Sequence, residues 1–197
     1  MKKINFFQKI LIICLLFLIT FSYFYGFYIN ENVAGGGGYT GDLSAVFKNL
    51  QIFVNNKFID SIKLTTDNNL YYTNRPPLLY ILHSWLNPYS NNLELFRLTV
   101  FFISFFVPIL FYFSLRIKFK TINNFYLLFL ASLILLSPYF RTSSYWALEE
   151  NYAFISILFS FIFLNFFFLK KIIIIYFLLF FLHLFVFILI KNFFLSL

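Results

Sequence analysis

Asp42 is the first side chain whose type and position suggest chemistry in this sequence. It follows the four glycines at 35–38 and precedes an amphipathic stretch. A carboxylate placed there could act as a general base that takes a proton from a hydroxyl or an amine. It could equally cap the start of the following helix by accepting a hydrogen bond from a backbone N–H. The residue types leave both roles open for Asp42.

Arg75 stands directly before Pro76-Pro77 and an apolar run. Proline is tolerated in the first turn of a helix, so we expect a short helix over 77–86. An arginine beside a helix start offers a forked cation and free backbone N–H groups to one anion, a combination that suits a phosphate. Alternatively, its apolar stem lies along a membrane surface while the guanidinium reaches water. Arg75 is thus a candidate phosphate ligand or an ordinary interfacial arginine.

A second polar stretch, 137–151, contains Arg141 and the adjacent acids Glu149 and Glu150. Adjacent acids are usually solvated, yet carboxylates beside apolar spans are costly and tend to be functional. Arg141 could pair with these acids or extend its head group to water. His83 falls on the short helix expected above, where a histidine is more often a surface side chain than a catalyst. We keep all four as polar site candidates.

No cofactor or metal site is expected. The sequence lacks the HExxH, GxSxG, Walker and dinucleotide-binding patterns. Its single cysteine, Cys14, allows neither an intramolecular disulfide nor a Cys-based metal site. The net charge of +8 could suggest nucleic acid as a partner. The basic residues, however, are spread over short loops without a basic stripe, so we exclude nucleic-acid binding.

Apolar runs dominate the elements that must position these residues. Hydrophobic residues make up 61% of the 197 and charged residues 11%, and the mean hydropathy is +0.84, which is outside the range of soluble domains. A helix of about 20 apolar residues spans a bilayer. Runs close to that length lie at about 9–29, 94–115, 124–140, 152–169 and 172–190. We therefore expect an all-α integral membrane protein, a single membrane domain over 1–197 with about five transmembrane helices.

Charge asymmetry indicates the orientation of these spans. Eight basic residues precede the first span or lie in the connections between spans two and three and between spans four and five: Lys2, Lys3, Lys9, Arg116, Lys118, Lys120, Lys170 and Lys171. Short loops rich in Lys and Arg remain cytoplasmic, and all seven acids fall on the opposite side. We expect a plasma (inner) membrane protein with a cytoplasmic N-terminus, an uncleaved first span and a long periplasmic or extracellular loop, 30–92.

The loop over 30–92 is expected to carry two interfacial amphipathic helices. From 40 to 58, apolar residues recur at spacings of three and four, with Lys48 and Asn49 off that face. This pattern is typical of a helix lying on a membrane surface. The second helix, 77–86, is too short to span. The lipid bilayer is therefore the expected partner of both helices.

These features together resemble a known family. A basic N-terminus and one span, then Gly41-Asp42, two loop helices and the element Arg75-Pro76-Pro77-Leu78-Leu79-Tyr80 resemble the GT-C type polytopic glycosyltransferases, notably the protein O-mannosyltransferase and lipid A aminoarabinose transferase branch. The resemblance covers about 1–170, and the Arg-Pro-Pro-Leu element is its more specific part. It implies transfer of a sugar from a polyprenyl-phosphate-linked donor to an unknown acceptor on the non-cytoplasmic face, by an inverting displacement at the anomeric carbon.

The resemblance also implies roles for single residues. Asp42 is similar to the catalytic base that activates the acceptor, and Arg75 is similar to the ligand of the donor phosphate. Arg141 resembles a further phosphate ligand, while Glu149 and Glu150 resemble polar contacts from the second outer loop. Arginine neutralises such a phosphate without a metal, and it stabilises the charge that grows as the phosphate leaves. Many relatives have paired acids where this chain has one, so the acceptor chemistry is left open.

Length separates this chain from that family. The shared membrane module of those enzymes has more spans than the five expected here, so the chain resembles the N-terminal portion of such an enzyme. This is compatible with a truncated product, with a split enzyme whose second polypeptide supplies the missing spans, or with an inactive copy. A non-catalytic membrane subunit or lipid-binding scaffold is the alternative function. A small transporter has less support, because no span carries an acid near its middle.

Overall fold

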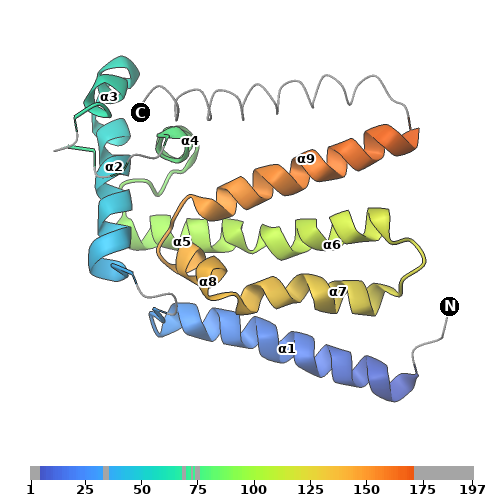
Figure 1. Cartoon of the computed structure of the whole chain (residues 1–197). Helices are drawn as coiled ribbons and strands as arrows, with labels where there is room; N and C mark the ends of the chain where they lie inside the picture. Colours follow the sequence, from blue (N-terminus) through green and yellow to red (C-terminus); the bar gives the residue numbers. More distant parts are fainter. Residues whose placement is uncertain (1–4, 33–35, 68–69, 72, 74–75, 171–197) are drawn as a thin grey trace.

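The computed structural model describes residues 5–32, 36–67, 70–71, 73 and 76–170, and these residues form helices without a strand (Figure 1). In chain order the elements are α1 (Phe6–Tyr28), the π-helical turn η1 (Tyr39–Leu43), α2 (Ser44–Asn55), α3 (Phe58–Leu64), α4 (Leu78–Leu86), α5 (Leu93–Ser104), α6 (Phe106–Lys118), α7 (Asn124–Ser132), the 3₁₀ turn η2 (Leu133–Leu136), α8 (Pro138–Tyr145) and α9 (Glu150–Lys170). The all-helical class expected from the sequence is confirmed for the described residues.

Two groups of helices divide the structure. α1, α5, α6, α7 and α9 lie side by side as a bundle, in which α6 contacts both α7 and α9, and α7 contacts α1 (Figure 1). α2, α3 and α4 lie across one end of this bundle, while the start of α1, the α6–α7 connection and the last turn of α9 lie at the other end. Basic residues of the short connections, such as Lys118 and Lys120, therefore belong to the end remote from α2–α4.

Two of the described helices are long and apolar enough to cross a membrane. They are α1, with 23 residues, and Leu93–Lys118, which comprises α5 and α6 and has 26 residues. The pair Asn124–Leu136 and Pro138–Tyr145, bent by 67°, makes a third if it is counted as one span. The chain is therefore a membrane protein, and the spans expected at 9–29 and 94–115 fall on the first two helices.

The remaining expected spans have different outcomes. α9 covers the span expected at 152–169, but its apolar part, Glu150–Phe166, is shorter than the two helices above. The span expected at 172–190 lies outside the described residues. The count of five spans stays a prediction. Helices also occupy both stretches expected in the outer loop, and their position at a membrane surface stays a prediction too.

The stretch 137–151, expected as an outer loop, contains the buried helix α8. Pro138 has no N–H and cannot continue η2, and Ser137 caps α8 by accepting a hydrogen bond from the N–H of Phe140 at 3.4 Å. α8 packs against α5, α9 and η2, and most of its side chains, Arg141 included, are buried. The expectation of a loop without helix there is wrong, because the polar groups of α8 find partners inside the bundle; its position on the outer side stays a prediction.

α2 is enclosed more fully than a helix lying on a surface. Val46, Leu50 and Phe53 are buried, as the amphipathic pattern predicts. Asn49, expected off the apolar face, is also buried, and its side chain donates a hydrogen bond to the hydroxyl of Tyr80 on α4 at 3.4 Å. The placement expected for Asn49 is therefore wrong, because α4 covers that face of α2 as well.

Arg97 on α5 joins the ends of α1 and α8. Its Nε donates to the carbonyl of Tyr145 at 2.7 Å, and its Nη2 donates to the carbonyl of Phe27 at 3.3 Å. The guanidinium also lies over the rings of Phe27 and Trp146, at 4.3 and 4.8 Å from their centroids. Glu94, 3.6 Å away, balances the charge. With 4% of its side chain exposed, Arg97 is an internal connection between helices and not a surface cation.

Replacing Arg97 with methionine should lower the free energy of unfolding by about 3 kcal/mol, because the buried carbonyl of Tyr145 loses its donor. Thermal unfolding in detergent, followed by circular dichroism, should then give a Tm lower by roughly 9 °C. Lys118→Met removes an exposed cation from α6 and serves as the matched control, with little expected change in Tm. Equal Tm values for the two variants would contradict the role given to Arg97.

Candidate functional site

Asp42 lies in the turn η1, where the glycine run folds back onto its carboxylate. Its Oδ2 accepts a hydrogen bond from the N–H of Gly38 at 3.1 Å. Gly38 has φ +56°, a conformation that favours glycine, and a Cβ on Gly36 would lie only 2.8 Å from the same Oδ2. The half-buried Asp42 therefore caps its own loop with one oxygen. Among the described residues, Gly38 is the one hydrogen-bond donor to this carboxylate.

The two candidate phosphate ligands have different outcomes. Arg75 lies outside the described residues. Arg141 is buried on α8, and each nitrogen of its guanidinium is engaged: Nη1 with Glu31 Oε2 at 2.8 Å, Nη2 with Ser22 Oγ at 2.6 Å, and Nε with the carbonyl of Leu135 at 3.0 Å. An anion that approached Arg141 would therefore compete with Glu31.

Gly26 makes room for this ion pair on α1. A Cβ at that position would overlap Glu31 Oε2 and would lie 2.6 Å from the hydroxyl of Tyr145. That hydroxyl donates to the carbonyl of Tyr23 at 2.6 Å.

Sequence reasoning missed Glu31 as a site residue, although it is the first acid after the first span. The Glu31–Arg141 pair joins residues 110 apart in the chain, a separation that no local pattern reports.

Glu149 and His83 come together where α4 meets the first turn of α9. Tyr80 donates to Glu149 Oε1 at 2.5 Å, and His83 Nε2 lies 2.6 Å from the hydroxyl of Tyr152. Tyr80 and His83 are three residues apart on α4, and Glu149 and Tyr152 are three residues apart at the start of α9, so one face of α4 meets the start of α9. Burial and the carboxylate of Glu149 raise the pKa of Tyr80 well above its usual value, so Tyr80 stays a hydrogen-bond donor.

Glu150 faces away from this contact. Its Oε2 accepts a hydrogen bond from Ser143 Oγ of α8 at 3.0 Å. The adjacent acids therefore serve different neighbours, Glu149 toward α4 and Glu150 toward α8. The structure brings His83 and Glu149 together but joins neither of them to Asp42 by a hydrogen bond among the described residues.

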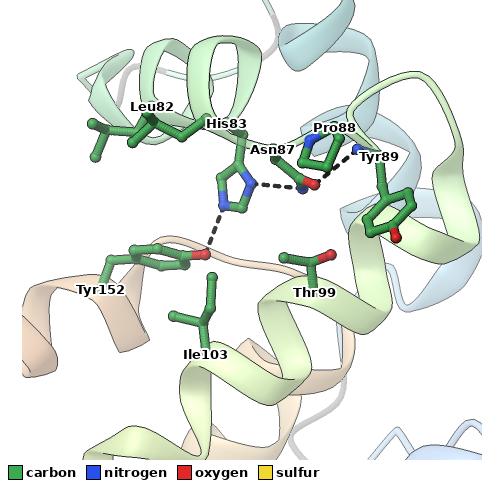
Figure 2. A pocket seen from close by; sticks show the side chains of 9 residues that line it. Leu82, His83, Asn87, Pro88, Tyr89, Thr99, Ile103 and Tyr152 are labelled. Atoms are coloured by element: carbon green, nitrogen blue, oxygen red, sulfur yellow. Dashed lines mark hydrogen bonds between the residues drawn. The ribbon is translucent and has the colours of Figure 1, made fainter.

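The tautomer of His83 follows from its neighbours (Figure 2). The Oδ1 of Asn87 accepts the N–H of Tyr89 at 2.9 Å, which turns the amide nitrogen toward His83 Nδ1 at 3.0 Å. Nδ1 is then an acceptor, so the ring proton is on Nε2 and is donated to the oxygen of Tyr152. The hydroxyl proton of Tyr152 is left for another acceptor. Burial also lowers the pKa of His83 to about 4, so the ring is neutral at pH 7.

A pocket of about 290 Å³ lies beside this histidine, between α4, α5, α9 and the connection after α4. Figure 2 shows His83 and Tyr152 on one side of it and Thr99 and Ile103 of α5 on the other. No lining residue carries a formal charge. Within the described ranges there is also no group of three or more His, Cys, Asp or Glu that could hold a metal ion. The residues that line the pocket can therefore bind a ligand by hydrogen bonds and apolar contacts.

Comparison with known proteins adds no family to this description: no protein-family model matches the chain, and neither a curated protein nor a solved structure matches it. The site is therefore interpreted from its own residues. Three residues of these polar contacts, Tyr80, Tyr152 and Glu31, were not expected as site residues from the sequence. For Tyr80, the sequence does contain a signal: its spacing of three from His83 places both residues on the same face of a helix.

Stability should fall as the pH is lowered from about 6.5 toward about 4, because the unfolded chain binds a proton at His83 that the folded chain excludes. The loss reaches about 3 kcal/mol for this group alone. Unfolding in detergent micelles at several pH values measures it. His83→Gln should flatten the slope in this window, whereas Tyr152→Phe, which keeps the histidine buried, should retain it. The same slope in wild type and His83→Gln would show that His83 is not the titrating group.

Proposed function

We propose that this chain is a GT-C-like glycosyltransferase, or the N-terminal portion of one, that transfers a sugar from a polyprenyl-phosphate donor to an acceptor on the non-cytoplasmic face. The observation that carries the proposal is the placement of polar groups at one end of the bundle. Asp42, His83 and Glu149 belong to the end crossed by α2–α4 (Figure 1). The basic connections belong to the other end. The element that begins at Arg75 supplies the resemblance on which the activity rests.

Asp42 is the proposed general base. Gly38 holds one carboxylate oxygen at 3.1 Å, and the second oxygen takes the proton of the acceptor hydroxyl or amine. The deprotonated acceptor attacks the anomeric carbon, and the bond from that carbon to the phosphate oxygen breaks. The polyprenyl phosphate leaves with the bonding electrons. Arg75 is the proposed cation that stabilises its growing negative charge.

A non-catalytic membrane subunit or lipid-binding scaffold derived from such an enzyme is the second proposed function. The engagement of Arg141 favours it. Glu31 neutralises this arginine, and Ser22 and the carbonyl of Leu135 occupy its other nitrogens. One of the two proposed phosphate ligands therefore has a structural partner already. In this second function another polypeptide supplies the missing spans and the remaining catalytic groups.

The proposed orientation places the N-terminus in the cytoplasm and α2–α4 in the periplasm or outside the cell. Single-cysteine variants test it in a Cys14→Ser background, with a maleimide that cannot cross the membrane. Asn91→Cys should react in intact cells, because this exposed residue lies in the proposed outer loop. Lys120→Cys, also exposed, should react only after permeabilisation. The opposite labelling pattern would refute the orientation.

Asp42→Asn should reduce sugar transfer by a factor of about 100 or more, because the amide cannot take a proton. The amide oxygen can still accept the N–H of Gly38, so the fold and membrane insertion should persist. Transfer of radiolabelled sugar from a polyprenyl-phosphate donor, in membranes that contain the full chain, measures the effect. Asp60→Asn removes an exposed acid on α3 and should leave transfer unchanged. Unchanged transfer by Asp42→Asn would show that Asp42 is not the general base.

A further inference from the structure

The pocket beside His83 is suited to an apolar ligand. Its volume of about 290 Å³ is near the lower end of small-molecule sites. Leu82 and Leu86 of α4 and Ile103 of α5 supply apolar surface, and no lining residue carries a formal charge. The hydroxyl of Thr99 already donates to the carbonyl of Leu95 at 2.8 Å. A charged head group would therefore find no partner in the pocket.

Tyr152 gives this apolar pocket one hydrogen-bond donor. Its oxygen accepts the Nε2–H of His83 at 2.6 Å, and its own proton has no acceptor among the described residues. Asn87 donates one amide N–H to His83 Nδ1 and accepts the backbone N–H of Tyr89 with its Oδ1. A ligand that placed an uncharged acceptor oxygen near Tyr152 would complete this chain of hydrogen bonds. The pocket thus combines room for a hydrocarbon chain with the hydroxyl donor of Tyr152.

The rim of the pocket indicates its depth in the membrane. Leu86 and Tyr89 line the pocket and are 76% and 51% exposed, and the neighbouring Trp85 is 66% exposed. Tryptophan and tyrosine gather where hydrocarbon meets the head groups. Phe58 of α3 packs beside Trp85 with ring centroids 5.5 Å apart and extends this rim. The proposed interfacial position of α4 would place the opening of the pocket at the level where glycerolipids carry their ester groups.

We propose that the pocket binds one acyl chain of a diacyl glycerophospholipid, with an ester carbonyl oxygen accepting the hydrogen bond of Tyr152. The chain follows α5 past Ile103 into the bilayer, and the charged head group stays outside the pocket in water. A polyprenyl phosphate fits less well, because its chain has no carbonyl oxygen and its phosphate would find no cation among the lining residues. This inference does not rest on the proposed transferase activity.

Native mass spectrometry of the full chain in a neutral detergent tests the proposal, with dioleoyl phosphatidylcholine as the probe and its diether analogue for comparison. Wild type should retain one diester lipid, and the diether lipid should bind about fivefold more weakly, as expected for one lost hydrogen bond. Tyr152→Phe should weaken the diester lipid to the level of the diether lipid and leave the diether lipid unchanged. Ile103→Phe, which fills the pocket, should prevent retention of both.

Two variants at exposed residues outside the pocket serve as controls. Tyr126→Phe on α7 and Ile109→Phe on α6 make the same side-chain changes at residues that are 45% and 39% exposed and lie outside the pocket. Both should retain the diester lipid as wild type does. Equal retention of diester and diether lipid by wild type overturns the proposal. Displacement of the diester lipid by an equal concentration of polyprenyl phosphate overturns it as well.

Discussion

The guanidinium of Arg97 satisfies carbonyl groups that lipid could not. The last carbonyls of a helix have no donor within that helix, and a bilayer core supplies none. Phe27 and Tyr145 lie in the last turns of α1 and α8, and Arg97 donates to the carbonyls of both. One buried side chain on α5 therefore joins the end of α1 to the end of α8. The end of the bundle crossed by α2–α4 depends on that arrangement.

Two further polar systems are attached to this end. The pair Glu31–Arg141 ties the chain after α1 to α8. The contacts of α4 with the first turn of α9, through Glu149 and Tyr152, hold the loop helices over the bundle. Each system uses a charged or hydroxyl side chain whose partner comes from another segment of the chain, since a buried polar group is costly without a hydrogen-bond partner. The same contacts that hold the fold engage most of these polar groups, while Gly38 is the one described hydrogen-bond donor to Asp42.

Sequence reasoning succeeded where the physical cause was local. The long apolar runs predicted α1 and the α5–α6 helix, and the Pro-Pro element predicted the start of α4. It failed at α8, because a helix rich in Ser, Thr and Arg is read as a loop when its partners are unknown. It failed at Asn49 for the same reason. The link between Arg141 and Glu31 spans 110 residues, and only the packed bundle brings them together.

The 67° bend between η2 and α8 has a consequence for the surrounding lipid. α7 has 9 residues and η2 has 4, which gives a straight length of only about 21 Å from their rises per residue. A typical hydrocarbon core is about 30 Å thick. If this bent pair is counted as one span, lipids beside α7 meet an apolar wall shorter than the hydrocarbon core. Local thinning of the bilayer, or a preference for a thinner membrane, would match it.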